Sequence, residues 1–250
     1  MNKKTYKTLL ICAAALIVTA MIAAAGFFIR PVNIWMFHSV SDEPINPAAP
    51  DLSVSSADFE RLIKYIADKN IKCGFIGEKA DLFITLDDGY TDNFTTAFPI
   101  LKKYSIPATV FAVASLIGTE GYLTKAQILE MSDSGLVSIQ SHGYSHTRLD
   151  ELDSETLAFE LEQAKNIIES ITGKPVTALS YPEGSYNKAV IQAAEKFYTQ
   201  AVTTKTPNIY NCRNKLSLPR TGIPSGFNGD IYHLTSKINF YELLKYSKLN

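Results

Sequence analysis

Short apolar runs alternate with amphipathic runs from residue 33 to residue 203, and this alternation leaves the chain few possible folds. The runs typical of buried strands are residues 33–37, 82–86, 106–113, 136–139, 178–181 and 201–203. Runs with the spacing of amphipathic helices lie between several of them. Repeated strand–helix units build a parallel sheet with helices outside it, either open or closed into a barrel. The sequence therefore predicts an α/β fold.

The helical runs carry signals for their ends. Ser56 and Ser154 are placed to cap two helices, and Gly173 is placed to end the second. Further helices are predicted around residues 94–101, where apolar side chains repeat every three or four residues, and over 187–196. The chain has 250 residues, of which 46% are hydrophobic, so it can bury a substantial core as one domain.

The first 30 residues predict a membrane segment. Residues 8–29 carry no charge. As a helix they would be roughly 33 Å long at 1.5 Å per residue, about the thickness of a bilayer core. Three lysines precede the run, which predicts that this end stays in the cytoplasm and that the rest of the chain is exported. We expect an anchor over residues 1–30 and one domain over 31–250 that faces the extracellular side.

A cleaved signal peptide is the alternative for the same segment. Residues 23–25 are all alanine and offer an A-x-A cleavage pattern, in which case the protein would be secreted. The apolar run is long for the core of a signal peptide. We therefore favour the uncleaved anchor.

Charge and cysteine content exclude several classes of partner and site. Residues 31–250 keep 20 of the 24 basic residues and all 25 acidic ones, a formal charge of −5. This balance does not suggest nucleic acid as a partner, and no protein partner is predicted. Cys73 and Cys212 could pair, but two scattered cysteines are no disulfide framework. No C-x-x-C is present, so a cysteine zinc site is excluded.

Polar residues follow the predicted strands. His38 ends the first, Asp87 and Asp88 follow the second, and His142 and Tyr181 follow two later ones. In parallel α/β folds, ligands gather where the carboxyl ends of the strands emerge. We therefore expect these side chains to share one edge of the sheet.

Each polar pair alone is weak evidence for a site. Acidic residues before glycine usually form a turn or cap a helix, and two histidines four residues apart are more often surface or core residues than ligands. Together, one carboxylate and two imidazoles form a common open site for zinc or another divalent ion. A second carboxylate can then act as a general base. The sequence has no G-x-S-x-G, H-E-x-x-H, Walker or G-x-G-x-x-G motif, which removes the usual signatures of competing enzymes.

Four motifs resemble those of the polysaccharide deacetylases, carbohydrate esterase family 4. TLDDG (85–89) resembles the T-F-D-D-G motif, and SHGYSH (141–146) resembles H-[S/T]-x-x-H with glycine at the second position. LSYPEGSYN (179–187) is similar to the Y-P-x-G segment of the biofilm-polysaccharide branch, and LPR (218–220) to its arginine motif. The resemblance implies a distorted (β/α) barrel after one N-terminal hydrophobic helix.

The resemblance also implies roles for residues at the motif positions. Asp87 would be the general base, held and oriented by Arg220. Asp88, His142 and His146 would hold a divalent metal, most simply Zn²⁺, with Co²⁺ or Ni²⁺ as alternatives.

Two roles are implied for the Y-P-x-G segment. Tyr181 would bind substrate and offer its backbone N–H to the oxyanion. Pro182 would line the substrate groove.

The general acid departs from the common family pattern. Many members take it from a C-terminal strand that ends leucine-x-x-histidine, whereas this tail offers only His233 in another context. The N-terminal IWMFH resembles the opening Y-H-x-V of the biofilm branch, in which the motif order is permuted. We expect His38 to be the acid and His233 to be structural.

The resemblance implies a metal-dependent N-deacetylase acting on an extracellular polymer of N-acetylglucosamine. The linkage could be β-1,4, as in cell-wall glycan, or β-1,6, as in biofilm poly-N-acetylglucosamine. An O-acetyl esterase acting on xylan or another glycan is the nearest alternative, because the same metal site could serve it. A non-catalytic glycan-binding wall protein is the alternative from a different class.

Overall fold

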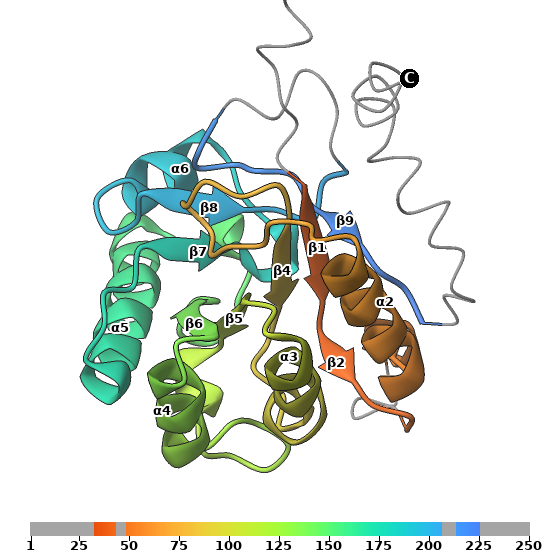
Figure 1. Ribbon diagram of the computed structural model, residues 1–250. Coiled ribbons are helices and arrows are strands. Elements are labelled where there is room, and N and C mark those ends of the chain that lie inside the picture. The colour runs from red at the N-terminus through yellow and green to blue at the C-terminus, as the bar shows by residue number, and fades with distance from the viewer. Residues whose placement is uncertain (1–32, 44–48, 207–213, 226–250) are drawn as a thin grey trace, which may run out of the picture. The chain divides into compact units, whose positions relative to one another are not determined.

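The computed structural model describes residues 33–43, 49–206 and 214–225 (Figure 1). The predictions for residues 1–30, Cys212 and His233 lie outside these ranges. Within them, no helix combines the length and the apolar character needed to cross a membrane. Cys73 has a free thiol.

A seven-stranded parallel sheet forms the centre of the fold, with the strand order β8-β7-β6-β5-β4-β1-β9 (Figure 1). Its strands are β1 (Ile34–Phe37), β4 (Phe83–Leu86), β5 (Ala108–Ala112), β6 (Val137–Ser141), β7 (Ala178–Ser180), β8 (Gln200–Val202) and β9 (Thr221–Gly222). A second parallel pair joins β2 (Ser39–Val40) to β3 (Ser53–Val54). The six predicted strands are all present, because their apolar runs are buried on both faces of the sheet.

Residues 218–222 link the two edges of the curled sheet. Leu218 forms a parallel bridge with Val202 at the end of β8. A few residues later, β9 pairs with β1 through Thr221 opposite Trp35. The sheet is thereby drawn toward closure, which gives the predicted distorted (β/α) barrel.

Helices cover the outside of the sheet (Figure 1). They are α2 (Ser56–Asp68), α3 (Phe98–Tyr104), α4 (Lys125–Asp133), α5 (Ser154–Thr172) and α6 (Lys188–Ala194). A π-helical turn, η2 (Asn93–Ala97), precedes α3, and short 3-10 turns are η1 (Pro50–Leu52), η3 (Ala114–Leu116), η4 (Leu149–Glu151) and η5 (Pro182–Gly184). The alternation did not predict α4, whose start is fixed by a capping box between Thr124 and Gln127.

Two predicted caps are wrong by one residue. The hydroxyl of Ser55, not of Ser56, accepts the backbone N–H of Asp58 at the start of α2. The carboxylate of Asp153, not the hydroxyl of Ser154, caps α5 by accepting two backbone N–H groups. Gly173 ends α5 in the left-handed region at φ 65°, as predicted.

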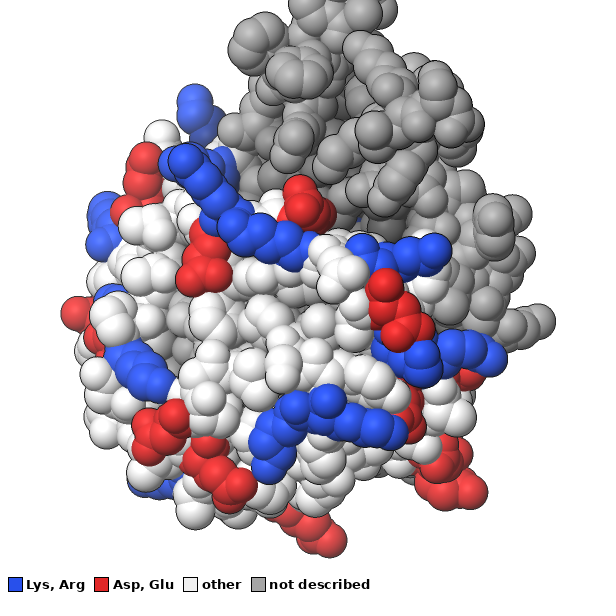
Figure 2. Space-filling model, in the orientation of Figure 1, with Lys and Arg blue, Asp and Glu red and all other residues white. Residues whose placement is uncertain are grey.

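On the face shown in Figure 2, basic and acidic side chains are interspersed. The described residues on this face form no continuous basic patch of the kind that attracts a polyanion.

Candidate functional site

The carboxyl ends of three strands bring predicted polar residues to one cavity. The residue after β1 is His38, the residue after β4 is Asp87, and the residue after β6 is His142. These three side chains line a cavity of about 170 Å³. The full lining is His38, Leu52, Asp87, Asp88, His142, His146, Tyr181, Glu183 and Thr204.

Three of the lining residues form a group that can hold a metal ion. One ligand atom each from Asp88, His142 and His146 lies within 4.8 Å of the other two. Nε2 of His142 is 3.2 Å and Nε2 of His146 is 3.4 Å from Oδ1 of Asp88. That oxygen is buried and makes no hydrogen bond. A buried, unpaired carboxylate oxygen facing two imidazole nitrogens fits a divalent cation.

A hydrogen bond to a backbone carbonyl fixes the orientation of the His142 ring. Its Nδ1 lies 2.8 Å from the carbonyl oxygen of Ser180. A carbonyl can only accept, so Nδ1 carries a proton, and in the neutral ring Nε2 presents its lone pair to the site. The tautomer required of a ligand is therefore imposed by the end of β7.

Two ligands have a strained backbone. Asp88 has φ 71° and His146 has φ 64°, in the left-handed region that residues with a Cβ rarely adopt. Such strain persists where the surroundings impose it, and it clusters at functional sites. Gly143, between the two histidines, has φ 76°, and a Cβ there would lie 3.3 Å from Cγ of Pro182. The backbone conformation and the close packing at the second motif position therefore favour glycine.

Asp87 is held by Arg220. Nη1 donates to Oδ1 at 2.7 Å and Nη2 donates to Oδ2 at 2.5 Å. The two side chains are 2% and 0% exposed, respectively. Ser180 Oγ donates to the same carboxylate at 3.0 Å. This bidentate grip is what the predicted orienting role of Arg220 requires.

Charge sets the protonation of the carboxylates. Burial would raise the pKa of Asp87, but Arg220 and His142 outweigh it and hold that pKa below its usual range. Burial would likewise raise the pKa of Asp88, but the neighbouring imidazoles lower it. Burial would lower the pKa of His142, but Asp87 and Asp88 raise it above its usual value. Both carboxylates are thus ionised at neutral pH and favour a bound cation.

His38 also lines the cavity. It follows β1, which lies beside β4 on the side away from β6, so His38 and His142 lie on opposite sides of Asp87 along the sheet. The amide of Asn93 donates to the backbone carbonyl of His38 at 2.9 Å. The neighbouring Asp92 accepts the hydroxyl of Ser39 and, at 3.1 Å, the N–H of Val40. Burial lowers the pKa of His38, although Asp87 and Asp88 oppose this effect. The chain after β1 is therefore fixed by the π-helical turn, and its imidazole faces two carboxylates.

One implied role, the contact of the Tyr181 amide with the oxyanion, does not fit this geometry, and the role of Pro182 in the substrate groove stays a prediction. The backbone N–H of Tyr181 donates to Val202 O at 3.2 Å within the sheet, so it is not free to bind an oxyanion. Its hydroxyl donates to Leu216 O at 2.8 Å. Pro182 is buried and is not among the residues lining the cavity; the next residue, Glu183, is. The turn after β7 buries the proline, whereas Oε2 of the glutamate at the rim of the cavity lies 3.7 Å from Nη1 of Arg148.

Sequence reasoning missed residues that support the site. Ser180 contacts Asp87, Arg220 and His142 at once. Its place at the end of a buried, otherwise apolar strand could have marked Ser180 as a supporting residue of the site. Glu160, on α5, contacts the loop that carries the histidines, but nothing in its local sequence marks it.

A family model described as polysaccharide deacetylase matches residues 77–202. YxkH of Bacillus subtilis, assigned to the polysaccharide deacetylases, is 32% identical over 213 residues, which cover 80% of this chain and 74% of that protein. The poly-beta-1,6-N-acetyl-D-glucosamine N-deacetylase of Staphylococcus epidermidis is 30% identical over 172 residues, which cover 64% of this chain and 58% of that enzyme.

Solved structures share the fold. A polysaccharide deacetylase from Bacillus cereus superposes with a TM-score of 0.71 at 31% identity, covering 77% of this chain and 65% of that one. The Streptococcus pyogenes deacetylase PplD, solved with acetate, gives a TM-score of 0.70 at 25% identity and covers 77% and 92% of the two chains. The chain thus spans about two thirds of the Bacillus cereus protein and less of the Staphylococcus epidermidis enzyme.

Proposed function

The chain belongs to the polysaccharide deacetylase family, and we propose that it removes N-acetyl groups from N-acetylglucosamine units of an extracellular polysaccharide. One observation carries the proposal. A cation-binding group of one carboxylate and two imidazoles shares a cavity with a second carboxylate that a buried arginine holds in place. This pairing of a metal site with a fixed base suits hydrolysis of an amide.

The metal site is proposed to hold a divalent ion, with Asp88, His142 and His146 as its ligands. Zn²⁺ suits the mixed oxygen and nitrogen donors, and Co²⁺ or Ni²⁺ would also fit them. When bound, the ion would polarise the acetamide carbonyl and lower the pKa of a water molecule beside it.

The protein's own residues would move two protons. Asp87 accepts a proton from the attacking water, while Arg220 keeps its carboxylate oriented. His38 donates a proton to the departing amine nitrogen. The C–N bond breaks, acetate leaves, and the sugar keeps a free amine. Because burial lowers the pKa of His38, its charged form depends on the carboxylates that face it.

The substrate is proposed to be poly-β-1,6-N-acetylglucosamine, with a β-1,4-linked cell-wall glycan as the second candidate. The name of the Staphylococcus epidermidis relative supports the first. Deacetylation would make either polymer cationic. The membrane segment proposed for residues 8–29 would hold the enzyme at the outer surface, where such polymers lie, and cleavage near residue 25 would release it.

Acetate release from a panel of glycans tests the proposal. Purified protein, loaded with Zn²⁺, Co²⁺ or Ni²⁺, is offered β-1,6- and β-1,4-linked N-acetylglucosamine oligomers and acetylated xylan. We expect acetate from at least one of the amino-sugar oligomers and little from xylan. Acetate from xylan alone would instead identify an O-acetyl esterase. A protein that holds no stoichiometric metal and releases no acetate would indicate a non-catalytic glycan-binding protein.

Asp88→Asn is the decisive variant. Asparagine tolerates the left-handed backbone at this position but supplies a weaker ligand. We expect loss of both stoichiometric metal and acetate release. Asp133→Asn, which makes the same change at an exposed position on α4, should retain both. An Asp88→Asn protein with parental activity would overturn the proposal.

A further inference from the structure

We propose that Glu160, on the outer helix α5, is a positioning residue that sets His146 in place for metal binding. The inference rests on the proposed metal site. It assigns a task to a buried acidic side chain that touches neither the cavity nor the ligands themselves.

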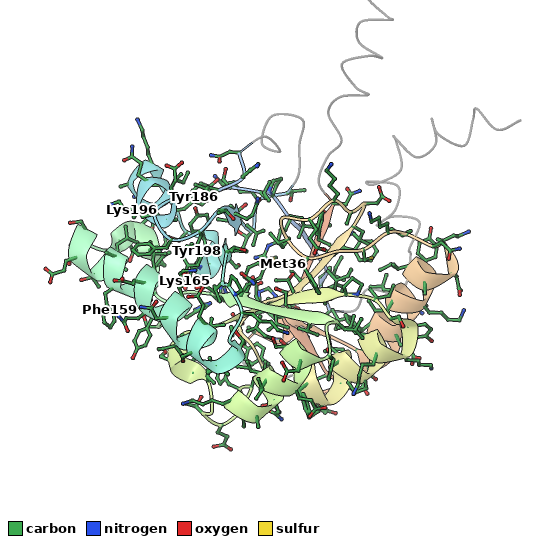
Figure 3. The ribbon with its side chains drawn as sticks, turned by 60° about the vertical axis from the view of Figure 1, so that its left-hand side comes forward. Met36, Phe159, Lys165, Tyr186, Lys196 and Tyr198 are labelled. Atoms are coloured by element: carbon green, nitrogen blue, oxygen red, sulfur yellow. The ribbon has the colours of Figure 1, made fainter. Side chains whose placement is uncertain are left out.

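Glu160 lies on the inner side of α5. It is 5% exposed, whereas its neighbour Phe159 is 48% exposed and projects outward from the helix in Figure 3. A carboxylate is rarely buried unless strong partners replace its water. The partners found here identify what the residue does.

All three partners of the carboxylate belong to the loop between the two histidines. Oε2 accepts the backbone N–H groups of Tyr144 and Ser145, each at 2.9 Å. Oε1 accepts the hydroxyl of Ser145. Hydrogen bonds to an ionised acceptor are the stronger kind. One side chain of α5 therefore fixes the backbone immediately before His146.

His146 needs this support more than His142 does. His142 is 3% exposed at its side chain, and its ring is bound through Nδ1 to Ser180 O. The His146 side chain is 34% exposed, and its ring contacts in the described residues are with Asp88 and His142. The backbone of His146 also has φ 64°, a left-handed conformation that is strained for a residue with a Cβ. The orientation of the His146 ring, and so the position of its Nε2, therefore depends on the loop that Glu160 binds.

The close packing at Gly143 agrees with this arrangement. A Cβ at that glycine would lie 3.5 Å from Oε2 of Glu160 and 3.3 Å from Pro182. The carboxylate and the proline therefore confine the loop from two sides. A loop held in this way can keep two imidazoles converging on one carboxylate oxygen in the absence of the ion.

Metal affinity measured on the full-length protein tests the inference. In Glu160→Leu the N–H groups of Tyr144 and Ser145 lose their acceptor, and we expect the affinity for Zn²⁺ and Co²⁺ to fall by about tenfold or more, in the range known for residues that orient ligands. Glu160→Gln keeps a carbonyl oxygen that can accept both N–H groups, so its affinity should stay within about threefold of the parental value. Rescue by glutamine would show that placement, not charge, is the contribution.

Controls separate positioning from stability. Glu162→Gln removes the same charge from an exposed position on α5 and should leave the affinity unchanged. Affinity is read by competition with a chromogenic chelator, and unfolding midpoints of the metal-free proteins are recorded alongside. If Glu160→Leu does not fold, Ser145→Ala removes the hydroxyl contacts of an exposed residue with Glu160 and Thr147, and Thr147→Val, which removes the Thr147 hydroxyl alone, serves as its control. Ser145→Ala should weaken metal binding by about two- to fivefold.

Two outcomes overturn the inference. If folded Glu160→Leu, or Ser145→Ala where the former does not fold, binds metal as tightly as the parental protein, Glu160 does not position His146, while the proposed function stands. If the parental protein binds no stoichiometric metal, the proposed metal site and this inference fail together.

Discussion

Arg220→Met would test how far the buried ion pair at the base of the site supports the fold. The guanidinium donates to both oxygens of Asp87, and its Nε donates to Thr203 O at 3.0 Å. It also donates to the hydroxyls of Thr85 and Ser180 at 3.1 Å and 2.9 Å. Methionine fills a similar space but offers no donor. The Asp87 carboxylate would remain in the interior without its countercharge.

The expected cost follows from this burial. Removing one partner of a fully buried pair costs about 3–5 kcal/mol, because an uncompensated charge is left behind. Domains are stable by about 5–15 kcal/mol, so the loss is a large fraction of the total. At about 2–4 °C per kcal/mol for a chain of this size, the unfolding midpoint should fall by about 6–20 °C. Arg61→Met removes an exposed arginine paired with Asp58 and should cost less than about 1 kcal/mol.

A double-mutant cycle decides whether the charge is the cause. In Arg220→Met/Asp87→Asn no unpaired charge remains, so the double variant should be more stable than the sum of the single losses predicts, by about 2 kcal/mol or more. Urea unfolding in the presence of a chelator excludes stabilisation by metal. The single tryptophan, Trp35 in β1, reports on the same region, since its carbonyl accepts the hydroxyl of Thr85. A cost below about 1 kcal/mol for Arg220→Met, or strict additivity, would refute the reasoning.

Two further predictions concern residues away from the site. Burial raises the pKa of the Cys73 thiol to about 12. Iodoacetamide at pH 8 should therefore alkylate Cys73 of the folded protein roughly 1000-fold more slowly than Cys73 of the protein unfolded in urea. Peptide mass spectrometry measures the two rates, and comparable rates would contradict the prediction. Ser105 ends α3 at φ 55°, so Ser105→Gly should stabilise the protein by about 0.5–1 kcal/mol in urea unfolding. Ser134→Gly, at a right-handed position that ends α4, should destabilise it by a similar amount; the same sign in both variants would contradict the account.

The sequence predicted the clustering of the site because parallel strands place their carboxyl ends at one edge. Asp87 follows a buried apolar run directly and His142 follows one after two polar residues, so their positions depended mainly on the direction of the strands. The implied use of the Tyr181 amide depended on which carbonyl of β8 lies opposite it. That pairing is a property of strand register, and no local pattern of residues reports it.

The supporting contacts could not be predicted for a related reason. Glu160 is 14 residues from His146 and lies on a helix that carries three other glutamates, at positions 155, 162 and 169. Only the packing of α5 against the loop distinguishes the buried glutamate from the exposed Glu162. Similarly, Ser55 and Ser56 are equally good capping residues in sequence, and the backbone conformation of Ser55 decides between them.

The position of His38 follows from strand register. The same register places two titratable side chains, His38 and Asp87, at neighbouring positions in the site. β1 lies directly beside β4, with Phe37 opposite Leu86, so the next residues on the two strands, His38 and Asp87, emerge together. Arg220 keeps Asp87 ionised. An ionised carboxylate can act as a general base, but it has no proton to donate to the departing amine. An imidazole has a higher intrinsic pKa than a carboxylate, and for His38 burial lowers the pKa while Asp87 and Asp88 raise it. Insertion of the first strand beside β4 therefore brings a second titratable group of a different kind to the same cavity.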